Sequence, residues 1–355
     1  MVKGPATVTV DGTCHILGSD VSGQRIEIRA GKALPFEPRG RCRLRARLGR
    51  GGRMWLASPE GAGVSMWQDI ARKVAALACG NKITIMLAGE ADTGKSTLSA
   101  YLANMALGSG LEPCVVDGDI GQGDLAPPAS IGAGVISKRV TDLRNARPTL
   151  FEFVGSTSPT GFEHLVAKKL KSILERAAAI GNICIVNTDG YARDNGVQYK
   201  LMLAKELQPD IIVCLENPEL LDTLLDGPWQ VLPVRASSQA PKTRYERKSH
   251  RLDQFLRHVG SGSSDADLSQ ITFQYMDRLF SPSELARPPI MQMESENMNR
   301  MFVGLGSNNM LTGFGIVTDI ASDRIRVQTD VDYFDRINLS NIRLCTESPV
   351  EISLD

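Results

Sequence analysis

The chain has 355 residues, and its 40 Lys and Arg balance 40 Asp and Glu, so the formal net charge is zero. This balance excludes a globally basic nucleic-acid binder, and any such site must be a local patch. The hydrophobic fraction of 42% is typical of a globular protein of roughly two or three domains. No apolar run approaches the ~20 residues that span a bilayer, so we expect no membrane partner.

The seven cysteines are scattered along the chain without a CxxC pair. This spacing argues against a disulfide framework and against a structural zinc site. We therefore expect a reducing compartment, the cytoplasm, or the nucleus if the source is eukaryotic.

Short alternating segments predict an N-terminal β-sandwich-like domain over residues 1–63. The segments are 6–10, 25–29 and 41–45, and Gly- and Pro-containing turns separate them. Arginines alternate along the third segment. They form either a basic surface stripe or the ordinary solvated face of a strand.

The hydrophobic period changes to that of a helix near residue 64, and residues 64–79 are predicted to form an amphipathic helix. Continuous apolar runs then alternate with helical segments from 83 to about 235, which predicts an α/β domain over 64–288 with a buried parallel sheet. After Pro288-Pro289 the pattern returns to β, so a C-terminal β-rich domain is expected over 289–355.

A P-loop follows the first of these apolar runs and opens a helix, in the pattern G-x-x-x-x-G-K-[ST]. It consists of Gly89, Glu90, Ala91, Asp92, Thr93, Gly94, Lys95, Ser96 and Thr97. Backbone N–H groups of such a loop and the N-terminus of the helix bind phosphates, so we expect a bound purine nucleoside triphosphate. Lys95 should reach the β- and γ-phosphates, and the Ser96 hydroxyl should hold Mg²⁺ or another divalent cation.

Two carboxylates, Asp117 and Asp119, follow the next apolar strand, 113–116. The carboxyl end of a strand is where an open α/β sheet places its ligand crevice. A carboxylate there can ligate Mg²⁺ or accept a proton from an attacking hydroxyl. Which of the two lies nearer the metal remains open.

Other P-loop classes lack their motifs here. The chain has no N-K-x-D guanine motif, no L-S-G-G-Q-like signature and no second lysine early in the loop. A kinase needs a cationic lid over the γ-phosphate, and the best candidate lies near 235–258. Arg244, Arg247 and Arg251 are spaced three and four apart in this segment, on one face of a helix. A merely solvated basic helix is the alternative.

The chain resembles the polynucleotide 5′-hydroxyl kinase family, which includes the kinase subunit of the eukaryotic pre-mRNA cleavage factor and the rRNA-processing kinases. Its single-chain archaeal members are the most similar. The resemblance covers residues 83–260 and rests on the P-loop and on the segments 116–123, 153–159 and 186–191. The basic cluster 244–251 matches by position.

This resemblance implies transfer of the γ-phosphate of ATP to the 5′-OH of RNA, with DNA as an alternative acceptor. Asp119 would be the general base, Gln122 and Thr157 would contact the substrate strand, and the arginines Arg244, Arg247 and Arg251 would close as the lid. Tyr191 stands where the family has Trp, and it could still stack on a base. Phe162 replaces an Asn of the family, which affects the expected positioning of the strand.

Two alternatives stay open, an ATP-binding scaffold of an RNA-processing complex with little catalysis, and a small-molecule kinase or ATPase. RNA-processing proteins are possible partners, and the sequence does not decide the oligomeric state.

Overall fold

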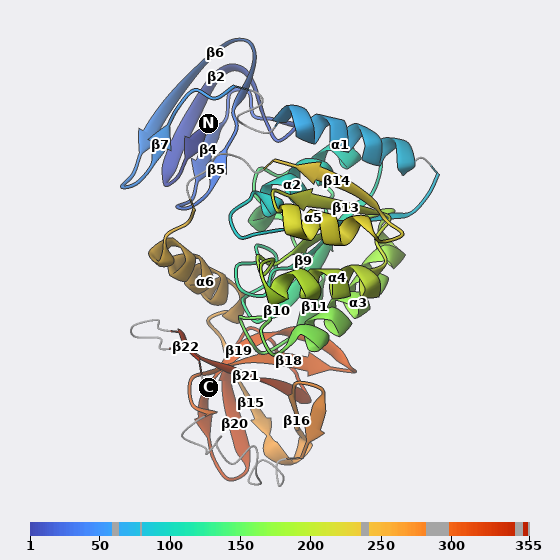
Figure 1. Ribbon diagram of the computed structural model, residues 1–355. Helices are drawn as coiled ribbons and strands as arrows, with labels where there is room; N and C mark the ends of the chain where they lie inside the picture. The colour runs from blue at the N-terminus through green and yellow to red at the C-terminus, as the bar shows by residue number, and fades with distance from the viewer. Residues whose placement is uncertain (59–63, 79, 236–240, 282–297, 345–350, 354–355) are drawn as a thin grey trace. The chain divides into compact units, whose positions relative to one another are not determined.

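The computed structural model describes residues 1–58, 64–78, 80–235, 241–281, 298–344 and 351–353. The chain forms two compact units, and Figure 1 labels their helices and strands. The first comprises Met1–Asp117, Ala133–Thr149 and Leu174–Lys248, and the second Gly118–Gly132, Leu150–Ile173 and Ser249–Asp355. Pro288-Pro289 and residues 236–240 of the predicted lid lie outside the described residues. The boundaries between the three predicted domains stay a prediction. No helix in the described part of the chain is long and apolar enough to cross a membrane.

Two small sheets form the N-terminal part of the first unit, where alternating segments predict strands. One has the order β5-β1-β7, and in the other the long strand β2 pairs with β3, β4 and β6. Val8 and Val10 of β2 are buried while Thr9 between them is exposed, as the period of two requires. The strands are β1 (Val2–Lys3), β2 (Ala6–Ile16), β3 (Ser19–Asp20), β4 (Arg25–Ile28), β5 (Ala33–Leu34), β6 (Glu37–Leu48) and β7 (Arg53–Met54).

A parallel sheet forms the core of the first unit, which confirms the predicted α/β class. Its order in this unit is β9-β12-β8-β13-β14, and β8 pairs in parallel with both β12 and β13. The sheet residues are almost all buried, because apolar strands of this kind are covered by helices on both faces. The strands are β8 (Ile83–Gly89), β9 (Pro113–Gly118), β12 (Ile183–Thr188), β13 (Ile211–Leu215) and β14 (Gln230–Val234). The helices are α1 (Val64–Leu77), α2 (Lys95–Gly108), α4 (Asn195–Leu207) and α5 (Pro218–Leu225), with a 3₁₀ turn, η1 (Leu143–Asn145).

One buried side chain fastens helix α2 to two distant segments of the first unit. The Asn104 amide nitrogen donates to Leu17 O at 2.8 Å and to Val140 O at 2.7 Å, and its oxygen accepts from Val140 N at 2.8 Å. Asn104 is fully buried, so these bonds replace the water that the amide would otherwise bind. The helix that begins with Lys95 is thereby tied to the turn after β2.

The second unit is built on an antiparallel-rich sheet of order β15-β20-β19-β18-β21-β16-β17, with β22 paired to β21. Phe153, Phe255, Phe302 and Phe314 form an aromatic core beside it. Strands β15 to β17 join this sheet although they precede residue 289. The strands are β15 (Ser263–Asp267), β16 (Thr272–Tyr275), β17 (Arg278–Phe280), β18 (Met301–Ser307), β19 (Met310–Ile320), β20 (Arg324–Gln328), β21 (Arg336–Leu344) and β22 (Glu351–Ser353), with a 3₁₀ turn, η2 (Leu268–Gln270).

Four elements extend along the chain from one unit into the other. Each therefore has residues in both units. They are β9, β10 (Ser130–Val135), α3 (Glu163–Ile180) and α6 (Arg244–Val259), while β11 (Leu150–Phe153) lies in the second unit.

Candidate functional site

The P-loop connects β8 to α2 and wraps tightly because two glycines take conformations that other residues avoid. Gly94 has φ of 99° and directly precedes the helix. At Gly89, φ is 149°, and an added Cβ would lie 2.6 Å from the Leu215 carbonyl oxygen. This wrapping presents backbone N–H groups and the α2 N-terminus to the inside of the loop, the arrangement that binds phosphate.

Lys95 is buried within its own loop, with only 6% of its surface exposed. Its Nζ donates to Gly89 O at 2.8 Å and to Glu90 O at 2.6 Å. A phosphate in the loop would compete with these carbonyls for the ammonium. The side chain is therefore at the predicted place, and its donors point to the loop.

Asn187 connects two of the predicted metal ligands. From the end of β12, its Nδ2 donates to Asp117 Oδ1 at 2.9 Å and approaches Ser96 Oγ at 3.3 Å. Asp117 and Asn187 are each about 1% exposed. The Asn187 Oδ1 is buried and has no hydrogen-bond partner among the described residues. The first unit therefore gathers a hydroxyl, a carboxylate and an unsatisfied carbonyl oxygen.

These oxygens fit a hard divalent cation such as Mg²⁺, which keeps waters and takes few protein ligands beside substrate phosphates. The described residues contain no cluster of three or more His, Cys, Asp or Glu side chains that could hold a metal. His, Cys, Asp and Glu side chains therefore do not form a complete set of metal ligands among the described residues. Ser96, Asp117 and the phosphates of a nucleotide would have to complete the coordination.

Two acidic side chains of the P-loop are bound by arginines of the first unit. Arg193 forms an ion pair with Glu90. Asp92 accepts from Arg247 of α6 at 2.6 Å, and from the backbone N–H of Lys242 at 2.9 Å. One predicted lid arginine thus contacts the P-loop directly. Glu90 and Asp92 can meet phosphate only through their backbone N–H groups, since their carboxylates would repel it.

In the second unit, Asp119 sits in a tight turn. Its Oδ1 accepts the N–H of Gly121 at 3.1 Å and of Gln122 at 2.8 Å, which fixes the orientation of the carboxylate. A Cβ at Gly121 would lie 2.8 Å from Thr157 O. The structure therefore brings the loop of Asp119 and Gln122 against the loop of Thr157.

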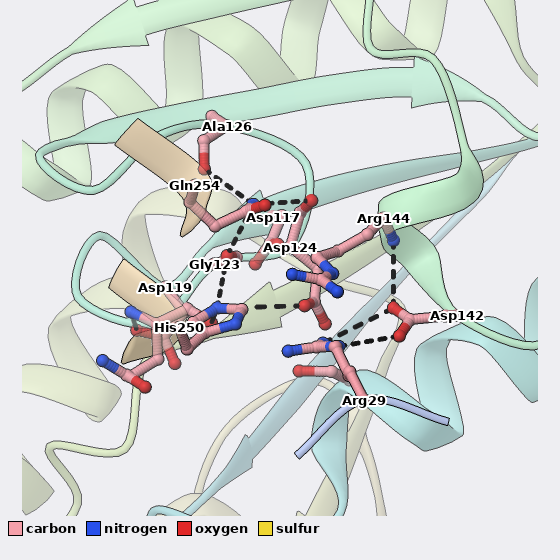
Figure 2. Close-up of polar contacts among 12 residues, drawn as sticks. Arg29, Asp117, Asp119, Gly123, Asp124, Ala126, Asp142, Arg144, His250 and Gln254 are labelled. Atoms are coloured by element: carbon pink, nitrogen blue, oxygen red, sulfur yellow. Dashed lines mark hydrogen bonds and ion pairs between the residues drawn. The ribbon is translucent and has the colours of Figure 1, made fainter. Parts of the chain in front are cut away.

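Two buried side chains of helix α6 form hydrogen bonds with the loop that follows Asp119 (Figure 2). His250 Nε2 lies 3.1 Å from Gln122 O and 3.0 Å from Gly123 O. Gln254 Nε2 donates to Gly123 O at 3.1 Å and Asp124 O at 2.9 Å. Because carbonyl oxygens only accept, Nε2 of His250 must carry a proton. Neither residue was predicted from the sequence.

The turn that carries Tyr191 is organised around the buried carboxylate of Asp189. Asp189 accepts from the Tyr191 N–H at 2.8 Å, from Tyr199 Oη at 3.0 Å and from Lys200 Nζ at 2.9 Å. Lys200 is fully buried. The ring of Tyr191 lies 5.8 Å from that of Tyr199, centroid to centroid. Tyr191 thus lies on a turn that buried hydrogen bonds hold in place, as a side chain that stacks on a nucleobase would require.

The surroundings of the remaining predicted residues say less about their roles. Arg244 is exposed at the start of α6, and Arg251 is half-buried further along it. Phe162 is also half-buried, and its N–H donates to Pro159 O at 2.8 Å. The P-loop, Asp117, Arg244, Arg247 and Tyr191 belong to the first unit, whereas Asp119, Gln122, Thr157 and Arg251 belong to the second.

A P-loop on a parallel sheet, with Asp117 and Asn187 at the ends of neighbouring strands, defines the chain as a P-loop nucleotide-binding protein of the kinase type. Residues 89–258 match the family model described as "mRNA cleavage and polyadenylation factor CLP1 P-loop". The P-loop core of this chain is similar to that family, as the motifs predict, and a P-loop of this kind indicates the use of ATP.

The names of individual relatives agree with this similarity. A polyribonucleotide 5′-hydroxyl-kinase of Pyrococcus horikoshii is 28% identical over 268 residues, which cover 74% of this chain and 73% of that protein. A polyribonucleotide 5′-hydroxyl-kinase Clp1 of Xenopus tropicalis is 30% identical over 192 residues, or 48% of this chain and 43% of the relative. A chain from a structure of the interface between Pcf11p and Clp1p has a TM-score of 0.71 at 12% identity, covering 96% of this chain and 95% of that one. This last likeness confirms the fold.

Proposed function

We propose that this protein is an ATP-dependent polynucleotide 5′-hydroxyl kinase, which transfers the γ-phosphate of ATP to the 5′-OH of RNA. The observation that carries the proposal is the turn that holds Asp119, in a chain that also has a complete P-loop. Its carboxylate is oriented by two backbone N–H groups and lies on a loop that packs against the loop of Thr157. The names of the curated relatives support the same activity.

The P-loop supplies charge stabilisation for the nucleotide. Backbone N–H groups of residues 89–94 hold the phosphates, and Lys95 exchanges its two carbonyl partners for phosphate oxygens. Mg²⁺, when bound, neutralises charge on the β- and γ-phosphates. Ser96 and Asp117 would hold it, and Asn187 orients Asp117 through its amide.

Asp119 accepts the proton of the 5′-OH as the oxygen attacks the γ-phosphorus in line. Gln122 and Thr157 position the strand, and Tyr191 stacks on a base at ~1–3 kcal/mol. Arg244, Arg247 and Arg251 form the lid that compensates charge on the moving phosphoryl group. The scattered cysteines are typical of a reducing compartment, so we propose the cytoplasm, or the nucleus if the source is eukaryotic.

The test is a transfer assay with γ-labelled ATP, Mg²⁺ and a 5′-OH oligoribonucleotide. Label should appear in the RNA, be lost with Lys95→Ala, and be lost with Asp119→Asn while ATP binding survives. A protein that binds ATP without transferring label would be a scaffold instead, and release of free phosphate alone would indicate an ATPase. A matched oligodeoxynucleotide decides whether DNA is also an acceptor.

A further inference from the structure

A concentrated row of arginines covers one face of strand β6 in the N-terminal part of the first unit. Residues 37–54 contain seven arginines, no lysine and one acid, in a chain whose total charge is zero. Five of them form what we name the arginine row. Its members are Arg39, Arg41, Arg43, Arg45 and Arg47, all exposed.

The register of the sheet explains why the row lies on one face. Arg43, Arg45 and Arg47 stand opposite Asp11, Thr9 and Thr7 of β2. The residues between them, such as Leu44 and Ala46, stand opposite the buried Val10 and Val8. Alternate residues of a strand share a face, so from Arg41 to Arg47 the guanidinium groups extend over roughly 20 Å. Long strands β2 and β6 lie side by side in Figure 1.

Little in the protein neutralises this row. Arg45 lies 3.9 Å from Asp11, and Arg39 lies 3.8 Å from Glu37. Among the described residues, no carboxylate lies within 4.0 Å of Arg41, Arg43 or Arg47. Like charges on one face of a sheet repel one another, so the row stabilises nothing within the fold.

The chemistry of the face indicates a polyanion with regularly spaced charges. Arginine rather than lysine supplies every cation, and its planar fork pairs with phosphate oxygens through two hydrogen bonds. Threonine hydroxyls at Thr7 and Thr9 can add bonds to the same oxygens. On β2, β4 and β6 themselves the sequence has no Phe, Tyr or Trp that could stack on a base.

We propose that the arginine row binds the phosphate backbone of the polynucleotide substrate, away from its 5′ end and without sequence preference. The inference rests on the proposed function and deepens it, because it gives the enzyme a second contact with a long substrate. Arginines that meet only phosphates hold a strand through counterion release, so the contact is salt-dependent and indifferent to base identity.

Binding is measured first, without catalysis. The triple variant Arg41→Gln, Arg43→Gln and Arg47→Gln is compared with the wild type by fluorescence anisotropy, on 3′-labelled single-stranded RNA of about 30 nucleotides with a free 5′-OH. We expect Kd to rise about tenfold or more, and the slope of log K against log salt to shrink by about two, since three single-strand phosphate contacts are lost. The loss should be equal for sequences of different composition.

Two further variants control the result. Lys73→Gln, Arg278→Gln and Arg324→Gln removes the same charge from exposed positions elsewhere and should leave Kd unchanged. The triple Arg→Lys variant at 41, 43 and 47 should keep most of the salt slope. If the Gln variant binds long RNA as the charge control does, the inference is overturned. Phosphate transfer by the wild type to a short oligonucleotide tests the proposed function separately, because a kinase with no role for the row would still label it.

Discussion

The guanidinium of Arg247, on the first turn of α6, lies 2.6 Å from Oδ2 of Asp92 in the P-loop. The backbone N–H of Lys242 donates to the same oxygen at 2.9 Å. Asp92 has φ of 63°, a left-handed conformation that Asp and Asn tolerate better than other side chains. A carboxylate of the P-loop therefore orients an arginine of the predicted lid, although a carboxylate beside phosphate would otherwise be unfavourable.

If Asp92 positions Arg247 for catalysis, the two residues should act as a unit. We expect Asp92→Asn and Arg247→Ala each to lower kcat/KM about tenfold, and the double variant to be no worse than either one, because coupled residues are non-additive. Asn retains the left-handed turn. Lys248→Ala, on the same turn of α6 but exposed, is the control and should keep the wild-type rate. Additive losses would show that the pair does not act together.

His250 should matter through the loop that it holds. His250→Ala removes the Nε2–H donor to Gln122 O and Gly123 O, so the Asp119 turn loosens and kcat falls about tenfold or more, as for other small misplacements of reacting groups. KM for ATP should not change.

Amide side chains of two different lengths at position 250 give a sharper test of this positioning role. The amide of Gln reaches as far as Nε2, whereas that of Asn reaches only as far as Nδ1. His250→Gln should therefore recover much of kcat and His250→Asn should not. Equal rates for the Gln and Ala variants would contradict a positioning role.

The Lys200–Asp189 pair should dominate the stability of the turn at the end of β12. Lys200→Met leaves the buried Asp189 carboxylate without its cation, which should lower the free energy of unfolding by about 3–5 kcal/mol. The control is Lys205→Met on the same helix, where the side chain is exposed and the expected change is below about 0.5 kcal/mol. Urea denaturation measures both, and similar midpoints for the two variants would refute the prediction.

His258 should make stability depend on pH. Burial, and secondarily the charge of Arg257, lowers the pKa of His258 to about 4. Its ring packs edge-on against Phe151 and Phe314. In the unfolded chain its pKa is near 6.5, so between these values the unfolded state binds more protons. Stability is therefore full above about pH 6.5 and declines as the pH falls towards 4, by up to about 3 kcal/mol.

His258→Phe keeps the ring and removes the titration. The urea midpoint of this variant should fall less than that of the wild type between pH 6.5 and 4. A parallel decline of the two proteins would assign the pH dependence to other groups.

Local patterns predicted the fold well, because their physical cause is local. The P-loop is one contiguous run whose glycines and lysine have fixed spacing, and the apolar run 113–116 predicted strand β9 at nearly its observed bounds. The Asp189 network was not predicted, because eleven residues separate Lys200 from Asp189 and no motif joins them.

Contacts between distant segments could not be predicted in this way. Nothing in the spacing joins His250 to Gly123, 127 residues earlier in the chain, or Asn187 to Asp117. A weak signal existed for each. Asn187 is a polar residue at the carboxyl end of an apolar strand, and His250 and Gln254 are four apart on a helix that is otherwise basic. The roles of all the predicted site residues, including Asp119 and the three lid arginines, stay predictions.

The three hydrogen bonds of Asn104 limit how this protein can be divided or recombined. A fragment that begins after the N-terminal sheets would lack Leu17, and the buried amide would lose one of its acceptors at a cost of about 1–3 kcal/mol. The nucleotide-binding helix is thus adapted to one particular N-terminal neighbour. Exchange of that neighbour for the equivalent piece of another P-loop protein should give a chimera that folds poorly unless a matching carbonyl is grafted with it.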